Sequence, residues 1–335
     1  MIGLILRRLA QLPLIVVVIY TITLMLAWLV PGNPLENPEG RQPPPEVIEQ
    51  LNRQYNLDSF PRFYFTYLDD ASGFSWLRDA ASGRLGDAAD RAQAEGVAPP
   101  ERYVFDFGPS LQYDDWNVNE IIAGALPVSV ALGAAAMVIA LFIGVGAGVV
   151  GAMRPNSIAD LATLAVALIG ISLPSFVIGT VLLLGFALLV PLFPVAAWGT
   201  PRSVVLPALT LSLPFAAYIA RLTRMGLIES LGADYIRTAR AKGVRESRVL
   251  LKHALKNAFL PVLSFLGPAT ALAMTGSFVV ERVFAVPGLG QHFVAGVQNK
   301  DLFLIMGVVL VFSTMLVLFN LAVDVLYRFV DPRIE

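Results

Sequence analysis

Charged and metal-binding side chains are scarce in this sequence. Among its 335 residues there is no cysteine, there are two histidines, and only 15% are Asp, Glu, Lys or Arg. Without cysteine the chain can form neither a disulfide nor a thiolate metal site. The two histidines, His253 and His292, lie far apart in the sequence, so a histidine metal centre is not expected either. We therefore predict no metal site in this chain.

The scarcity of charge is matched by an excess of apolar residues. Hydrophobic residues make up 56% of the chain, and the mean hydropathy is +0.68. A soluble domain of this length has more charge and less apolar content. The composition therefore predicts an integral membrane protein.

Six segments without charged residues are long enough, or nearly so, to cross a bilayer core, which needs ~20 apolar residues as a helix. They run over residues 9–30, 121–153, 161–190, 204–220, 258–280 and 302–323. The first segment is longer than the ~7–15-residue apolar core of a signal peptide, so we expect a retained helix. Pro174 should kink or interrupt the third. In the second, the spacing of Gly144 and Gly148 is typical of close helix packing.

Basic residues predict the orientation of these spans. Arg7 and Arg8 precede the first span, which places the N-terminus in the cytoplasm. Residues 221–257 contain nine basic residues and three acids, and the count of six spans puts this loop on the same side. The C-terminus, with Arg328 and Arg333, returns there as well. We expect a multi-pass protein of the cell (inner or plasma) membrane.

The long segment between the first two spans has the opposite charge. Residues 31–120 contain 16 acids and 7 arginines, and the span count places them outside the cytoplasm. A helix is predicted near residues 46–55, loops elsewhere, and a mobile or weakly helical stretch over residues 80–95. The segment is interpreted either as a solvated spacer or as a docking surface for a substrate-delivering partner, and its many aromatics favour a folded unit.

Ionisable groups are absent from the predicted middle of every span. Asp160 and Asp324 lie near span ends, and Asp324 is expected to pair with Arg221, Arg224 or Arg328. An ion-coupled transporter usually has an ionisable group at membrane depth, so this absence argues against secondary transport. Three serines in the spans lack a base at matching depth, which argues against an intramembrane enzyme and predicts no catalytic residue; they are Ser129, Ser172 and Ser212.

The cytoplasmic loop contains a short predicted helix with a stop signal at each end. Asp234 is the expected N-cap, Lys242 lies in the last turn, and Gly243 is the expected left-handed C′ residue. About two helical turns are not stable alone in water, so this helix needs packing or a partner. An apolar stripe is expected from Tyr235, Ile236 and Ala239. A second helix is predicted over residues 244–256, and a basic helix lying on anionic lipid is the alternative interpretation.

A second segment, residues 281–290, is predicted to turn sharply because it contains Pro287, Gly288 and Gly290. It follows the fifth span and should lie on the outer side. We interpret it as an outer gate or scoop at the pore mouth, with an ordinary interfacial turn as the alternative. The candidate residues are Glu281, Phe284, Pro287, Gly288 and Gly290.

Several motifs in order give the sequence a family resemblance. Arg-Thr-Ala-Arg-Ala-Lys-Gly at 237–243, His-Ala-Leu-Lys at 253–256 and Pro-Val-Leu at 261–263 resemble the "EAA" loop region of ATP-binding-cassette (ABC) importer permeases. Leu-Pro-Val-Ser at 126–129 and Glu-Arg-Val-Phe-Ala-Val-Pro-Gly-Leu-Gly at 281–290 fit as well. The chain thus resembles the B-type transmembrane permease subunit of oligopeptide, dipeptide and nickel ABC importers. Arg-Thr-Ala stands where the general motif has Glu-Ala-Ala.

This resemblance implies an all-α integral membrane protein with six transmembrane helices of the type I ABC importer permease fold and an extracytoplasmic insertion between helices 1 and 2. The implied organisation is the first transmembrane helix over residues 1–30, the insertion over 31–120, and a permease core over 121–335. The core holds helices 2–6 and a cytoplasmic coupling loop at residues 229–257. The outer segment is enlarged between residues 69 and 104.

The resemblance also implies a function. The chain would be the pore-forming, non-catalytic subunit of an importer for oligopeptides or dipeptides, with an ion-coupled secondary transporter as the alternative. Its partners would be a second homologous permease, two ABC ATPase subunits or domains, an extracytoplasmic substrate-binding protein and the lipid bilayer, but no nucleic acid. No cofactor is expected on this chain, which lacks a G-x-x-x-x-G-K-[ST] run, and ATP with magnesium would bind to partner subunits.

In such permeases the short cytoplasmic helix transmits ATPase closure to the spans. The residues that the resemblance assigns to ATPase coupling are Asp234, Tyr235, Ile236, Arg237, Thr238, Ala239, Arg240, Ala241, Lys242 and Gly243.

Overall fold

The predicted all-α class is confirmed. The computed structural model describes residues 2–31, 35, 44–85, 102–113, 115–275 and 278–330, and these ranges contain helices and one isolated β-bridge but no strand. The chain divides into two compact units, which are described separately. The first comprises Met1–Leu12, Leu126–Gln291 and Thr314–Glu335, and the second comprises Pro13–Ala125 and His292–Ser313.

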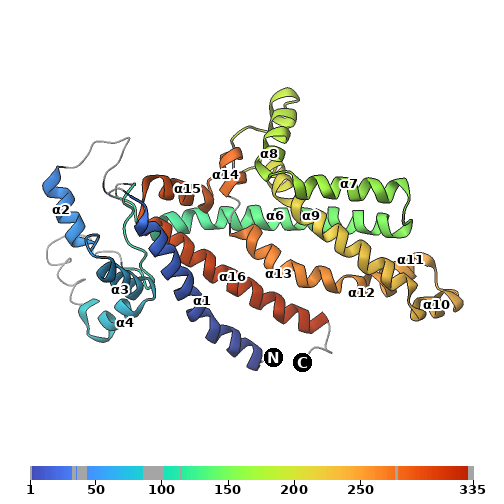
Figure 1. The fold of residues 1–335 in the computed structure, drawn as a ribbon, viewed down its shortest axis with the longest axis horizontal. Coiled ribbons are helices and arrows are strands. Elements are labelled where there is room, and N and C mark those ends of the chain that lie inside the picture. Colours follow the sequence, from blue (N-terminus) through green and yellow to red (C-terminus); the bar gives the residue numbers. More distant parts are fainter. Residues whose placement is uncertain are drawn as a thin grey trace. The chain divides into compact units, whose positions relative to one another are not determined.

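Within the described residues, four helices are long and apolar enough to cross a membrane. They are α1 (Ile2–Leu29), α6 (Val118–Met153), α9 (Pro201–Gly232) and α16 (Leu302–Val330) (Figure 1). Two further helix pairs pass the same test together but are bent, so up to six spans are present if each pair is one span. That upper count equals the number predicted.

The first bent pair lies where Pro174 predicted an interruption. Helix α7 (Ile158–Ser172) ends at the extended Leu173-Pro174, and α8 (Ser175–Leu183) follows, continued by a π-helical turn over Leu184–Leu189. The axes before and after the break differ by 106°. Proline causes the break because its ring disfavours a helical conformation in the residue before it.

The core of the first unit is built from apolar faces of α6, α9, α13 (Leu260–Met274) and α14 (Phe278–Phe284). Buried leucine, isoleucine and alanine side chains line α6 and α9, and Gly144 and Gly148 lie against α9 so closely that a Cβ on either would come within 2.7 Å of it. The predicted small-residue packing of this span is therefore confirmed.

Helix α9 does not end where the charges begin. A span over residues 204–220 that can extend past Arg221 was predicted, and the helix continues through Arg221 and Arg224 to Gly232. Arg224 donates to both carboxylate oxygens of Asp160 at the start of α7, at 2.5 and 2.7 Å, so its charge is neutralised inside the helix pair. The expected pairing of Arg224 with Asp324 is thus wrong, and Asp324 forms an ion pair with Arg8 at 2.8 Å.

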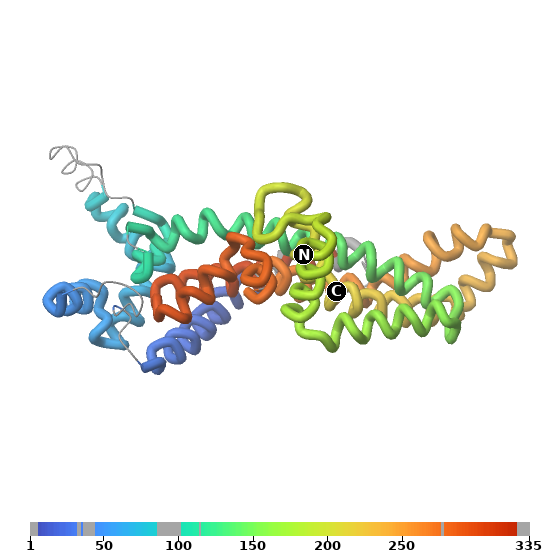
Figure 2. The backbone as a smooth tube through the Cα atoms, turned by 90° about the horizontal axis from the view of Figure 1, so that it is seen from above, coloured from blue at the N-terminus to red at the C-terminus, as the bar shows by residue number. Residues whose placement is uncertain are grey.

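After α9 the chain turns through α10 (Asp234–Ala241) and returns as α11 (Glu246–Arg248), a π-helical turn at Val249–Ala254, and α12 (Leu255–Ala258). This confirms a helix over most of residues 244–256. Helix α12 lies against α9 and leads into α13 at a bend of 54°. In Figure 2, α10 and the turn after it lie at one end of these helices, in yellow to orange.

Helix α13 ends at Met274, before the predicted end of the fifth span at residue 280. A separate helix, α14, follows, and α15 (Leu289–Asn299) begins after a short turn. A wholly non-helical segment at residues 281–290 was therefore wrong, because Glu281 through Phe284 are helical and only the stretch between α14 and α15 turns.

Among the described residues between α1 and α6, the second unit contains three short helices. Helix α2 (Pro45–Gln54) was predicted, whereas α3 (Phe60–Ala71) and α4 (Phe74–Ala81) replace the loops expected there. Aromatic residues at helical spacing on α3 explain the difference, because they pack on α1: the Tyr20 hydroxyl donates to the Tyr64 carbonyl at 2.8 Å. The interpretation of residues 80–95 falls mostly outside the described residues.

We predict that the ion pair between Asp160 and Arg224 stabilises the α7–α9 packing as a unit. In the purified chain, Asp160→Asn or Arg224→Gln alone should lower the melting temperature by several degrees, because the first leaves the half-buried Arg224 and the second the buried Asp160 without its partner. The double variant should melt above at least one single variant. Additive losses in the double variant would contradict this interpretation.

Candidate functional site

Helix α10 begins without the predicted side-chain cap. Ala233, in extended conformation with ψ of 153°, occupies the N-cap position, and Asp234 is the first helical residue. The carboxylate of Asp234 accepts a 3.3 Å bond from Arg237 one turn later. Asp234 as N-cap is therefore wrong, although a negative charge in the first turn still favours the helix through its dipole.

The end of α10 is the predicted one. Gly243 has φ of +75°, its N–H donates to the Arg240 carbonyl at 2.9 Å, and the Val244 N–H donates to the Ala239 carbonyl at 3.2 Å. These two bonds define a Schellman motif, in which a glycine in the left-handed conformation closes the last helical turn. The chain can therefore reverse direction directly after Lys242.

One face of α10 is anchored to the first unit. Ile236 is fully buried in a cluster with Leu227 of α9, with Val249 and Ala254 of the π-helical turn and with Ala258 of α12. Ala239 packs against this cluster. The predicted stripe is confirmed for these two residues but not for Tyr235, whose ring is 43% exposed. Its hydroxyl accepts a 3.0 Å bond from the Asn257 side chain.

The other face of α10 is exposed and mostly polar or basic. Its exposed residues are Asp234, Tyr235, Arg237, Thr238, Arg240, Ala241, Lys242 and Gly243. Arg240 donates two bonds to Glu246, which ties the helix to α11 across the turn. Hence eight of the ten predicted coupling residues lie on a surface, while Ile236 and Ala239 hold that surface in place.

The second candidate, at residues 281–290, is centred on a buried carboxylate. Glu281 is fully buried, and it accepts bonds from the Ser129 hydroxyl of α6 at 2.8 Å and from the Gly290 N–H at 2.7 Å. Ser129 in turn accepts a 2.9 Å bond from the Leu289 N–H. The network therefore fastens the turn between α14 and α15 to α6.

The remaining residues of this candidate divide between core and surface. Phe284 is buried close to Gly179 of α8, Gly288 and Gly290 are buried against Glu281, and Pro287 alone is exposed. Sequence reasoning missed Ser129 as their partner, since a single serine in an apolar span carries no signal of its own. We interpreted this segment as an outer gate or, alternatively, as an interfacial turn, and four of its five candidate residues are buried.

A third buried carboxylate, Asp301, was also missed. Its Oδ1 accepts from the Leu304 N–H at 3.1 Å and caps α16, while its Oδ2 accepts from the Ser110 hydroxyl at 2.6 Å and from the Leu111 N–H at 3.0 Å. Burial raises the pKa of this carboxyl, and the hydrogen bonds oppose that shift. An aspartate directly before an apolar helix is an N-cap signal that could have identified it.

Neither candidate carries the groups for bond chemistry. Among the described residues there is no cluster of three or more His, Cys, Asp or Glu side chains that could hold a metal ion. Helix α10 presents an exposed face with several basic residues. The hydrogen bonds of Glu281 with Ser129 and Gly290, here called the Glu281 latch, join the α14–α15 turn to α6.

Comparison with known proteins gives a consistent set of relatives. Residues 140–335 match the family described as "Binding-protein-dependent transport system inner membrane component". The chain is 38% identical over 338 residues to the oligopeptide transport system permease protein OppB of Escherichia coli (strain K12), with all of both chains covered. It is 37% identical to the dipeptide transport system permease protein DppB of Bacillus subtilis (strain 168), covering 96% of this chain and 94% of that relative.

Among solved structures, a chain of the MetNI methionine ABC transporter in an inward-facing conformation matches with a TM-score of 0.49. The match is 20% identical and covers 63% of this chain and 97% of that chain.

We predict that Gly243 is required for its backbone conformation alone. A Cβ at this position would meet nothing within 4 Å, so Gly243→Val should act through φ strain of ~1–2 kcal/mol and expose the amides of residues 243 and 244 to hydrogen exchange. Gly243→Asn, which tolerates this conformation, should keep their protection. Gly232→Ala, also unobstructed but without positive φ, is the control.

We also predict that Gly288 cannot be replaced by alanine. The new Cβ would lie 2.5 Å from both the Glu281 carboxylate and the Ser129 hydroxyl, so it should separate them and destabilise the chain by about 2–4 kcal/mol. Thermal unfolding of the purified chain measures this, and Gly146→Ala, whose Cβ has open space, should be neutral. Equal melting temperatures for the two variants would show that the contact between Glu281 and Ser129 is not needed for stability.

Proposed function

We propose, from the premise that this chain belongs to the family of binding-protein-dependent transport system inner membrane components, that it is the pore-forming permease subunit of an ABC importer for oligopeptides or dipeptides. The observation that supports peptides as the cargo is the 38% identity of this chain, over its full length, to an oligopeptide permease. As a permease, the chain is a non-catalytic subunit of its transporter.

We infer that α10 is the element through which the ATPase acts. Helix α10 carries the basic face. It connects without a flexible linker to α9 at one end and, through α12, to α13 at the other. A partner that moves α10 would therefore move two candidate spans together. ATP and magnesium belong to that partner in this proposal, and seating α10 in a cleft of the ATPase would bury its exposed residues.

The remaining parts of the assembly follow from the same premise. The proposed complex contains a second, homologous permease subunit, two ATPase subunits or domains, and an external binding protein that delivers the peptide. Both termini lie in the cytoplasm in this arrangement, which puts residues 31–120 outside, where the binding protein docks. The segment at residues 281–290 would act as an outer gate, with the Glu281 latch fixing its position on α6.

The alternative of an ion-coupled transporter is less well supported. Asp160 and Glu281, buried in the first unit, already have their partners in Arg224 and in Ser129 with Gly290. An ion-coupled mechanism needs an acid that can exchange its partner for Na⁺ or a proton.

The exposed face of α10 provides the test. In the reconstituted complex, Ala241→Arg should reduce peptide uptake at least about tenfold, because a large cation on this face obstructs docking without touching the buried Ile236. Binding-protein-stimulated ATP hydrolysis should fall in parallel.

Met153→Arg is the matched control, since it adds the same group at an exposed position at the end of α6. Its uptake should equal that of the unchanged chain. Full uptake by Ala241→Arg, or by a chain lacking residues 234–242, would contradict the coupling role of α10.

A further inference from the structure

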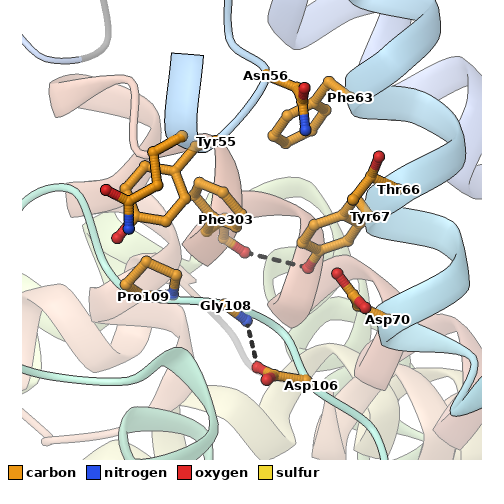
Figure 3. A pocket seen from close by; sticks show the side chains of 11 residues that line it. Tyr55, Asn56, Phe63, Thr66, Tyr67, Asp70, Asp106, Gly108, Pro109 and Phe303 are labelled. Carbon is orange, nitrogen blue, oxygen red and sulfur yellow. Dashed lines mark hydrogen bonds between the residues drawn. The ribbon is translucent and has the colours of Figure 1, made fainter. Parts of the chain in front are cut away.

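A cavity in the second unit has no part in the proposed coupling. It has a volume of about 220 Å³ and lies among the end of α2, one face of α3, the segment at residues 106–109 and the start of α16 (Figure 3). Its walls combine two kinds of side chain that proteins seldom place together without a reason, namely an aromatic cluster and two carboxylates.

The aromatic wall is tightly packed and buried. Phe63, Tyr67 and Phe303 are each at most 6% exposed, and Phe303 meets the other two rings at centroid distances of 5.4 and 5.7 Å. Tyr55 covers another side of Phe303 at 5.5 Å. Within this group the Tyr67 hydroxyl points to the Phe303 carbonyl at 3.4 Å, a long hydrogen bond (Figure 3). These rings present faces and edges that attract both apolar groups and cations.

The two carboxylates, Asp70 and Asp106, have no cationic partner within 4 Å among the described residues. The Arg78 guanidinium forms its ion pair with Asp69, at 2.7 Å, and not with either of them. Asp106 accepts a bond from the Gly108 N–H at 2.9 Å, which leaves most of its acceptor capacity free. Burial raises the pKa of Asp70, and the negative charges of Asp106 and Asp69 raise it further, whereas a hydrogen bond with the Ser75 side chain and the charge of Arg78 oppose the shift. A cation placed between Asp70 and Asp106 would offset the effects of burial and of negative charge.

We propose that this cavity binds a protonated primary amine carrying a small apolar or aromatic group. The ammonium would lie against Asp70 and Asp106, and the apolar group would lie on Phe63 and Phe303. The volume is below the ~300–1,000 Å³ of sites for drug-sized ligands, so the occupant is a fragment of one or two residues' size rather than an extended peptide. This inference does not rest on the proposed transport function.

The charge of the surrounding segment favours such a ligand. Residues 31–120 contain 16 acids and 7 arginines, so the approach to the cavity attracts cations and repels carboxylates. Free monoamines and the N-terminal residue of a short peptide share the proposed chemistry, and the experiment separates them. A divalent cation is less well matched, because the cavity has two acids and is lined largely by aromatic rings.

The full-length chain in detergent can be tested with 4-fluorophenethylamine as the probe, followed by ¹⁹F line broadening. Binding of the amine is expected, and 3-(4-fluorophenyl)propanoate, which has the same ring and the opposite charge, should not bind. Asp70→Asn and Asp106→Asn should each weaken binding at least about tenfold, since hydrogen bonds between charged groups contribute at least that factor. Asp115→Asn, an exposed acid of the same unit that does not line the cavity, should bind normally.

A blocking variant and a displacement measurement complete the test. Thr66→Trp places a large side chain at an exposed position that lines the cavity, and it should also abolish probe binding. Displacement of the probe by the dipeptide Phe-Gly, but not by N-acetyl-Phe-Gly, would identify peptide N-termini as ligands, whereas displacement by simple monoamines alone would identify free amines. Unchanged binding in the Asp70→Asn/Asp106→Asn double variant, equal binding of the propanoate, or calcium binding in place of the amine would each overturn the proposal.

Discussion

The packing of Ile236 is the interaction on which the proposed function depends. Helix α10 has only eight residues, and a helix of this length does not persist in water without tertiary contacts. Ile236 supplies that contact by full burial among α9, α12 and the π-helical turn, while the Schellman motif at Gly243 closes the other end. Because packing holds one face of α10 and hydrogen bonds close its end, we expect force applied to the exposed face to reach α9 and α13.

Much of this could be predicted because the responsible signals are local. Gly243 after a basic helical run predicts a left-handed stop, Pro174 predicts a broken span, and long apolar runs predict membrane helices. The family, too, was identified from short motifs and is supported by a match over residues 140–335. These features require no knowledge of which residues meet across the fold.

The errors arose where a distant partner decides the outcome. Arg224 was among the expected partners of Asp324, but its partner is Asp160, which lies 64 residues away in the sequence. Asp234 looked like a cap, yet the extended Ala233 takes that position. Helix α3 was missed because its stability comes from aromatic contacts, such as those with Tyr20 of α1, and not from a long apolar run, and α4, which lies against α3, was missed with it. The partner of Glu281 could not be predicted, since nothing marks Ser129 among the other serines of the spans.

The buried acids also bear on how a transporter of this kind is driven. In the first unit, Asp160 and Glu281 are each bound to groups that fix one arrangement of helices, namely α7 on α9 and the α14–α15 turn on α6. Exchanging such partners for an ion would expose a carboxylate in a poorly solvated place, which is energetically unfavourable. Motion that leaves these contacts intact moves α9 and α13 as blocks, and α10 is the exposed element joined to both. These buried contacts thus favour a mechanism in which a partner moves the chain at α10 over one in which ion binding within the chain causes the motion.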